Sequence, residues 1–143
     1  MPRAPAACAF CAVVAGADAH RVLDEASVVA FLDRAPLIKG HVLVVPREHV
    51  ETFDDLPPAL IAPLFSAVQR VSRAFGRTLG ADGSYTAINT RISQSVPHVH
   101  VHVVPRRKGD GLFRAGMVWI RRRYEGDEAA QLAARLREAI AAS

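Results

Sequence analysis

The sequence predicts an α+β fold: a mostly antiparallel five-stranded sheet with one long helix and a C-terminal helix. Two observations support this prediction. Short segments rich in β-branched residues follow one another along the chain, and two longer segments place apolar residues at helical spacing. The 143 residues are half hydrophobic and contain no run of about 20 apolar residues, so we expect one domain over residues 1–143 that does not enter a membrane.

Five segments have the composition and length of strands. Residues 20–34 are predicted to form two strands around a turn, because apolar and β-branched residues flank a polar break. Residues 41–46 form a third strand, which Pro46 closes. Residues 84–89 and 98–105 form the last two strands. The final one has a purely apolar face, so it should be a central strand of the sheet.

Two segments are predicted to be helices. Residues 59–80 form the long one, with Asp54 or Asp55 as its N-terminal cap and Gly80 at its end. Its apolar positions recur at helical spacing: Leu60, Leu64, Val68, Val71, Phe75 and Leu79. Residues 127–140 form an amphipathic helix that begins with acidic side chains, as the helix dipole favours.

The stretch "PHVHVHVVPRR", residues 97–107, alternates histidine with valine. Successive side chains of a strand point to opposite faces, so His98, His100 and His102 share one face and the valines share the other. Three imidazoles on one face could hold a metal, perform nucleophilic or acid/base chemistry, or form the wet side of a half-buried strand. Three of the six histidines in strict alternation favour a functional role.

Two further groups of residues suggest sites. Cys8 and Cys11 in "CAFC" have the spacing with which two thiolates bind one metal, although a redox pair or two buried apolar cysteines would look the same. His49 and one histidine of the 98–102 stretch would complete a Cys₂His₂ zinc site. The loop before the histidines is rich in neutral donors that suit phosphate oxygens: Asn89, Ser93, Gln94 and Ser95.

Charge and composition restrict the classes of molecule that the protein is expected to bind. The formal net charge is +4, which favours anionic partners. Basic residues cluster after the histidines: Arg106, Arg107, Lys108, Arg114, Arg121, Arg122 and Arg123. The aromatic residues nearby follow no base-stacking motif, so we expect no nucleic-acid polymer. The alanine-rich N-terminus contains both cysteines and does not resemble a signal peptide, which predicts a cytoplasmic protein without a membrane partner.

The residues "HVHVHVV" match the histidine triad motif His-φ-His-φ-His-φ-φ, in which φ is hydrophobic. With "CAFC", "FLDRAPLIKGHVLVVPREHV" and "SQSVPHVHVHVVPR", most of the chain resembles the HIT family of nucleotide hydrolases and transferases. The resemblance implies a homodimer, paired through the long helix and an adjoining strand. It also implies a purine nucleotide substrate that is cleaved at its α-phosphate, with a nucleotide or an amine as the leaving group.

The same resemblance implies roles for individual residues. His100 would be the nucleophile that forms a nucleotidyl-histidine intermediate, and His102 would support the phosphate or leaving group with charge or a proton. Gln94 and Ser95 would hold phosphate oxygens and the leaving group.

The resemblance also implies a nucleotide pocket. Phe10, Val13 and Phe31 would wall the purine, Asp33 would accept hydrogen bonds from ribose hydroxyls, and Asn89 would reach the ribose-phosphate side. Each of these residues also has an ordinary alternative, since the apolar ones could belong to the core and Asp33 to a turn.

Members of the family with a CxxC near the start hold zinc. The matching ligands here are Cys8, Cys11, His49 and His98. This zinc (Zn²⁺) would be structural, because it would join the N-terminal segment to the strand that carries the nucleophile.

The chain departs from the family pattern in one loop. The family commonly has a glycine before the glutamine, where this chain has Ser93, and residues 89–94 contain no glycine. In the variable C-terminal region, Trp119 and Arg114 are candidates for setting leaving-group preference. Two alternatives remain: a non-catalytic nucleotide-binding or scaffolding protein, and a metal enzyme that uses all three histidines as ligands.

Overall fold

The computed structural model describes residues 7–116 and 118–143 and confirms the α+β prediction. Its five strands form one sheet in the order β1-β2-β3-β5-β4, and every neighbouring pair is antiparallel. The strands are β1 (Arg21–Asp24), β2 (Val28–Leu32), β3 (Val42–Pro46), β4 (Gly83–Ala87) and β5 (Val101–Arg106). The helices are α1 (Ala9–Val14), α2 (Pro58–Leu79) and α3 (Glu128–Ala141), with a 3₁₀ turn at Phe53–Asp55.

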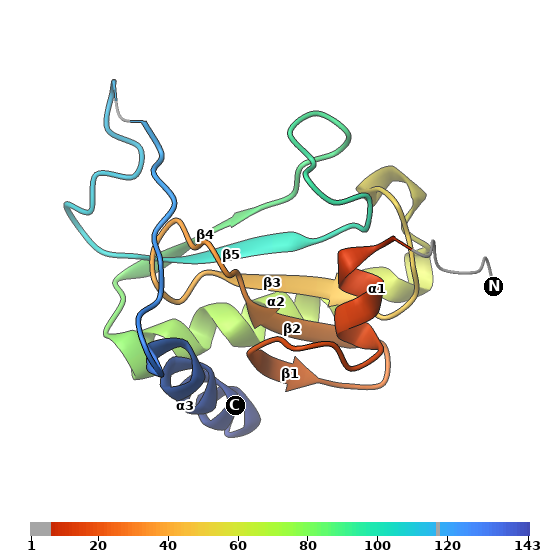
Figure 1. Ribbon diagram of the computed structural model, residues 1–143, viewed down its shortest axis with the longest axis horizontal. Helices are drawn as coiled ribbons and strands as arrows, with labels where there is room; N and C mark the ends of the chain where they lie inside the picture. The colour runs from red at the N-terminus through yellow and green to blue at the C-terminus, as the bar shows by residue number, and fades with distance from the viewer. Residues whose placement is uncertain (1–6, 117) are drawn as a thin grey trace.

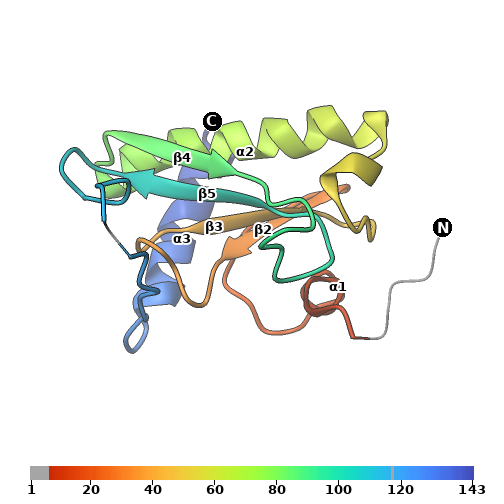
Figure 2. The same cartoon turned by 90° about the horizontal axis from the view of Figure 1, so that it is seen from above.

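The sheet is covered on both sides. Figure 2 shows α2 and α1 on opposite sides, and α3 packs beside α2 (Figure 1). All residues of β2 and β3 are therefore buried. Alternate residues serve two cores: Val28 and Ala30 belong to the core under α2 and α3, whereas Val29 and Phe31 belong to the core under α1. This explains why the sequence of β2 is apolar at every position.

The histidine-bearing segment has the predicted faces. Val99, Val101 and Val103 are fully buried against α2. β5 pairs with β3 on one side and β4 on the other, so it is an inner strand. The strand itself begins only at Val101, because His98 precedes the ladder and the N–H of Val99 donates to the carbonyl of Val50 at 2.8 Å.

The long helix has one correct and one incorrect terminal prediction. Gly80 adopts a left-handed conformation with φ of 61° and ends α2 as expected. The prediction that Asp54 or Asp55 caps its N-terminus is wrong, because both lie in the 3₁₀ turn and the hydroxyl of Thr52 donates to Asp55 at 2.7 Å. The helix instead begins at Pro58, whose ring needs no N–H partner.

The sequence reasoning did not predict α1. This helix has six residues, too few for an apolar period to be visible. It begins after Cys8, and it buries Phe10 and Val13 against the strands. Among the residues that the structure describes, we find no helix with the length and apolar character that crossing a membrane requires.

Candidate active site and metal centre

A cavity of about 790 Å³ lies between α1, the end of β2 and the histidines that precede and begin β5. It brings together most of the residues predicted for catalysis and nucleotide binding. Those that line it are Phe10, Val13, Phe31, Asp33, Ser95, His100 and His102, and Arg121 joins them. Gln94 and Asn89 are not among its lining residues.

His100 presents a free ring nitrogen to this cavity. Its Nδ1 lies 2.8 Å from the carbonyl oxygen of His98, which can only accept, so Nδ1 carries the proton and Nε2 keeps its lone pair. The ring of Phe10 packs edge-on against it, with 5.0 Å between centroids. Burial lowers the pKa of His100, which keeps the imidazole neutral at pH 7. A neutral imidazole with a free Nε2 is a competent nucleophile.

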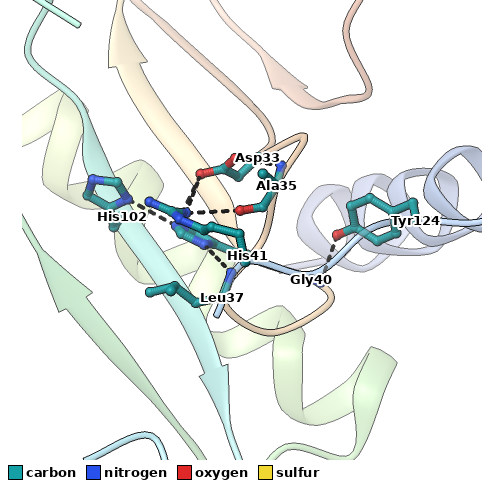
Figure 3. Close-up of polar contacts among 8 residues, drawn as sticks. Asp33, Ala35, Leu37, Gly40, His41, His102 and Tyr124 are labelled. Atoms are coloured by element: carbon teal, nitrogen blue, oxygen red, sulfur yellow. Dashed lines mark hydrogen bonds and ion pairs between the residues drawn. The ribbon is translucent and has the colours of Figure 1, made fainter. Parts of the chain in front are cut away.

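His102 is held by a histidine that the sequence reasoning missed. The N–H of Leu37 donates to Nδ1 of His41 at 3.1 Å, so Nε2 of His41 carries a proton. That nitrogen lies 3.0 Å from Nδ1 of His102 and donates to it (Figure 3). His102 therefore carries its own proton on Nε2, where it is available as a donor to a ligand.

Both histidines of this pair are neutral at pH 7. Burial, followed by the charges of His102 and Arg121, lowers the pKa of His41 to about 3. Burial, followed by the charges of His100 and Arg121, lowers the pKa of His102 to about 4. The direction of hydrogen bonding in the pair is thus constant over the physiological pH range.

Gly40 sets the position of His41. Its φ is +105°, and a Cβ there would come within 2.7 Å of the side chain of Leu79. Its N–H donates to the hydroxyl of Tyr124 at 2.9 Å (Figure 3). The sequence shows only that His41 lies two residues before Leu43 and so shares its face. The register, in which Leu43 pairs with His102, shows that this face also carries the histidines.

Asp33 follows β2 and has two close partners. Its Oδ1 accepts from the N–H of Ala35 at 2.9 Å (Figure 3). Its Oδ2 lies 3.2 Å from Nη1 of Arg121. Oδ2 is also 3.8 Å from Nε2 of His41. Sequence reasoning placed Arg121 in a basic cluster without a role, because nothing local connects it to a residue so far away in the chain.

The predicted leaving-group residues lie elsewhere. Trp119 packs against Tyr85 of β4 and against Phe113, which lies in the segment after β5, and neither Trp119 nor Arg114 is among the residues that line the cavity. These side chains therefore do not belong to the cavity wall.

The loop before the histidines is braced by one side chain. The amide nitrogen of Gln94 donates to the carbonyl oxygens of Glu51 and Val96, at 2.7 and 3.0 Å, and its oxygen accepts from the N–H of Arg91 at 2.9 Å. Ser93 adopts φ of 62°, the left-handed region in which glycine is favoured. The chain thus keeps a glycine-like backbone at the position where the expected glycine is missing.

A separate cluster fits a tetrahedral metal site. Cys8, Cys11, His49 and His98 place four ligand atoms within 4.8 Å of one another. The recorded separations are 3.5 Å for Sγ of either Cys8 or Cys11 to Nδ1 of His98, 3.2 Å for Cys11 to His49, and 3.3 Å between the histidines. Tetrahedral zinc with N and S ligands separates them by about 3.3–3.8 Å. The donor set and its spacing therefore suit zinc.

The tautomer of His98 agrees with a metal site. Nε2 of His98 donates to the carbonyl of Pro46 at 2.8 Å, which leaves Nδ1 free as a ligand. Burial, followed by the hydrogen bond and charge of Cys8, raises the pKa of Cys11 to about 11. Without a cation this thiol would stay protonated at neutral pH.

A metal site made from all three histidines does not fit the geometry. Among the described residues, His98 groups with the cysteines, whereas His102 groups with Asp33 and His41. In that second group the N–H of Leu37 keeps the proton of His41 on Nε2, the atom that would have to bind the metal. The arrangement supports one zinc site, at the cysteines.

Comparison with known proteins gives consistent matches. Residues 15–109 match the HIT domain. An uncharacterised HIT-like protein of Mycobacterium tuberculosis is 39% identical over 137 residues, which cover 94% of this chain and 93% of that protein. The asymmetrical bis(5′-nucleosyl)-tetraphosphatase of Schizosaccharomyces pombe is 39% identical over 83 residues, 57% of this chain and 46% of its own length. The crystal structure of a zinc-bound histidine triad family protein from Mycobacterium smegmatis superposes with a TM-score of 0.83 at 37% identity, covering 95% of this chain and 94% of that one.

Proposed function

The chain belongs to the HIT family, and we propose that it is a nucleotide hydrolase or nucleotidyltransferase that acts at the α-phosphate of a purine nucleotide derivative. The observation that carries this proposal is the pair of tautomers in the cavity. Nε2 of His100 is free to attack, while Nε2 of His102 carries a proton that can be donated to a ligand.

The first step forms a bond between Nε2 of His100 and the α-phosphorus and breaks the bond from phosphorus to the leaving group. The bonding pair leaves with that group, and Nε2–H of His102 donates a hydrogen bond to it. A phosphate leaves as an anion, whereas an amine takes up a proton from solvent and leaves as the neutral amine. The phosphorylated imidazole becomes cationic, and the carbonyl of His98, 2.8 Å from Nδ1, stabilises the charge.

The second step regenerates the free enzyme. A water or another acceptor hydroxyl attacks phosphorus, the P–N bond breaks, and its electron pair goes back to His100. The acceptor's proton goes to solvent. Water as acceptor gives a nucleoside monophosphate, and a different acceptor makes the same site a transferase.

The cavity provides a place for the nucleoside. Phe10, Val13 and Phe31 form its apolar part, and we assign the purine to it. Asp33 is the acceptor for ribose hydroxyls, because each carboxylate oxygen has lone pairs beyond those its recorded partners use. Ser95 is the donor to a phosphate oxygen.

The remaining phosphate contacts require a change in the loop. Gln94 reaches a phosphate only if its amide leaves the carbonyls of Glu51 and Val96. We propose that Gln94 and Asn89 join the substrate after such a rearrangement of residues 89–94. The left-handed residues Arg91 and Ser93 are the points where that loop is strained.

Zinc is proposed as a structural metal. Bound to Cys8, Cys11, His49 and His98, it would crosslink the start of α1 to the segment that carries the nucleophile. Phe10 and Val13 of α1 line the cavity, so the metal would keep these two side chains in position around the nucleoside. Reduced thiols are needed for such a site, which supports the proposal of a cytoplasmic protein.

We also propose a homodimer that pairs through α2 and β4. β4 is an edge strand of the sheet, and an edge strand offers unpaired backbone groups to a second copy. The exposed side chain of Ile61 on α2 supplies apolar surface on the same proposed interface.

The test is native mass spectrometry after brief incubation with adenosine 5′-phosphoramidate or diadenosine tetraphosphate, comparing wild type with His100→Ala. We expect an adduct of one nucleoside monophosphate on wild type alone, together with one zinc per chain. If neither donor gives an adduct or a released monophosphate, the proposed enzymatic activity is refuted and a nucleotide-binding scaffold is favoured.

A further inference from the structure

Arg121 is a cationic side chain of the cavity wall that comes from outside the histidine motif. The segment after β5 crosses the loop between β2 and β3, where the N–H of Arg122 donates to Pro36 O at 2.8 Å and its Nε donates to Leu37 O at 3.2 Å. These bonds fix the backbone next to Arg121. The guanidinium of Arg121 is thereby held against Asp33 rather than placed at random on the surface.

Most of the donors of this guanidinium remain available. Nη1 serves both Asp33 Oδ2, at 3.2 Å, and the carbonyl of Ala35, at 3.0 Å. A guanidinium has five N–H donors, and the recorded bonds of Arg121 among the described residues use only Nη1. The side chain is 49% exposed, so Nε and Nη2 can reach a ligand in the cavity. Arg34, the other arginine in the wall, instead donates to the carbonyl of Asp18.

Arg121 and His102 lie in the same part of the cavity wall. Nη1 of Arg121 is 3.2 Å from Oδ2 of Asp33, and a carboxylate oxygen of Asp33 lies within 4.8 Å of a ring nitrogen of His102. Asp33 carries a negative charge near the site of an anionic substrate, and Arg121 offsets it. The guanidinium also contributes, after burial and His100, to the lowered pKa of His102. Its field thus reaches the residue whose Nε2–H faces the leaving group.

We propose that Arg121 is a specificity-determining residue that binds an anionic leaving group. The protein would then prefer nucleotides whose α-phosphate carries a phosphate or polyphosphate over those whose α-phosphate carries a neutral amine. This inference rests on the proposed function and names the class of leaving group. It assigns the leaving-group preference to Arg121, which lines the cavity, in place of Arg114 and Trp119, which do not.

The test compares kcat/KM for diadenosine tetraphosphate and adenosine 5′-phosphoramidate in wild type, Arg121→Gln and Arg123→Gln. Arg123 is an exposed arginine two residues away, so its replacement makes the same charge change outside the cavity wall. Wild type should prefer the tetraphosphate. Arg121→Gln should lose roughly ten- to hundredfold with the tetraphosphate and under about threefold with the phosphoramidate, as expected for one lost charged hydrogen bond.

Arg123→Gln should keep the wild-type ratio of the two values, and Arg121→Lys should recover part of the tetraphosphate activity. The ratio is independent of how much of a variant folds, because both substrates meet the same preparation. Equal losses with both substrates, or no loss, would overturn the inference. Wild-type turnover of the phosphoramidate alone would also overturn it and leave the proposed function intact, whereas turnover of neither would refute the proposed function itself.

Discussion

Nε2 of His41 lies 3.0 Å from Nδ1 of His102, and this bond connects the start of β3 to the histidine motif on β5. His41 is fully buried, and its other nitrogen accepts from the backbone N–H of Leu37. The direction of the bond therefore follows from the backbone, and it determines which nitrogen of His102 holds the proton. Four predictions follow from this and other contacts.

Replacement of His41 by alanine should lower kcat by roughly ten- to hundredfold, the usual effect of losing the partner that orients a reacting imidazole. KM should change little, because His41 does not line the cavity. His41→Gln should recover part of kcat, since its amide nitrogen can donate to His102. Steady-state kinetics at pH 7 measures kcat and KM for wild type, His41→Ala and His41→Gln. Equal kcat in wild type and His41→Ala would contradict the role of His41 in orienting His102.

Acid should destabilise the wild type more than His41→Gln. The pKa of His41 falls from its ordinary 6.5 to about 3 on folding, so below pH 6.5 the unfolded chain binds a proton that the native protein does not. Stability is complete above pH 6.5 and declines as pH falls toward 3. Between pH 7 and 5 this one group should cost about 2 kcal/mol of unfolding free energy.

Urea unfolding of both proteins at the two pH values measures that difference. Protonation of the zinc ligands affects both proteins alike, so the comparison isolates His41. A decline of the same size in both would show that His41 accepts a proton in the folded state.

Removal of zinc should reduce the stability of the fold more than it slows the chemical step. A chelator, or the double variant Cys8→Ser/Cys11→Ser, should lower the unfolding free energy by several kcal/mol, on the order expected for a structural site. KM should rise while kcat falls less, because α1 carries Phe10 and Val13. Thermal unfolding with and without chelator checks this, and the chelator should have no further effect on the double variant.

Ser93→Gly should stabilise the protein. Ser93 has φ of 62°, and relief of its left-handed strain should raise the unfolding free energy by roughly 0.5–1 kcal/mol. Ser66→Gly, at an exposed position within α2, should instead lower it by roughly 0.5 kcal/mol. In urea titrations, the unfolding midpoints of the two variants should therefore shift in opposite directions from that of the wild type. A loss of stability in both variants would show that Ser93 makes contacts that glycine cannot replace.

Much of the fold was predictable because its signals are local. The long helix, its glycine stop and the strands follow from apolar periodicity and turn residues within single segments. The failures were also local in origin: α1 is too short to show a period, and the aspartates before α2 belong to a turn of their own. No local pattern distinguishes an aspartate that caps a helix from one that accepts a bond within the preceding turn.

The sequence by itself determined the chemical groups of the site. The alternation of His98, His100 and His102 with valine follows from the two-residue period of a strand, and the CxxC spacing of Cys8 and Cys11 shows a pair of possible ligands. Their grouping with His49 was implied by resemblance, and the structure brings the four together.

Only the tertiary structure decided what each imidazole does. His98 donates to Pro46, His100 donates to His98, and His102 accepts from His41. His98 therefore presents an unprotonated Nδ1, His100 an unprotonated Nε2 and His102 a protonated Nε2. Arg121 likewise reaches Asp33 across 88 positions of the chain. A histidine's tautomer is set by its hydrogen-bond partners, and these partners, like the ion pair, come from segments that meet only when the chain folds.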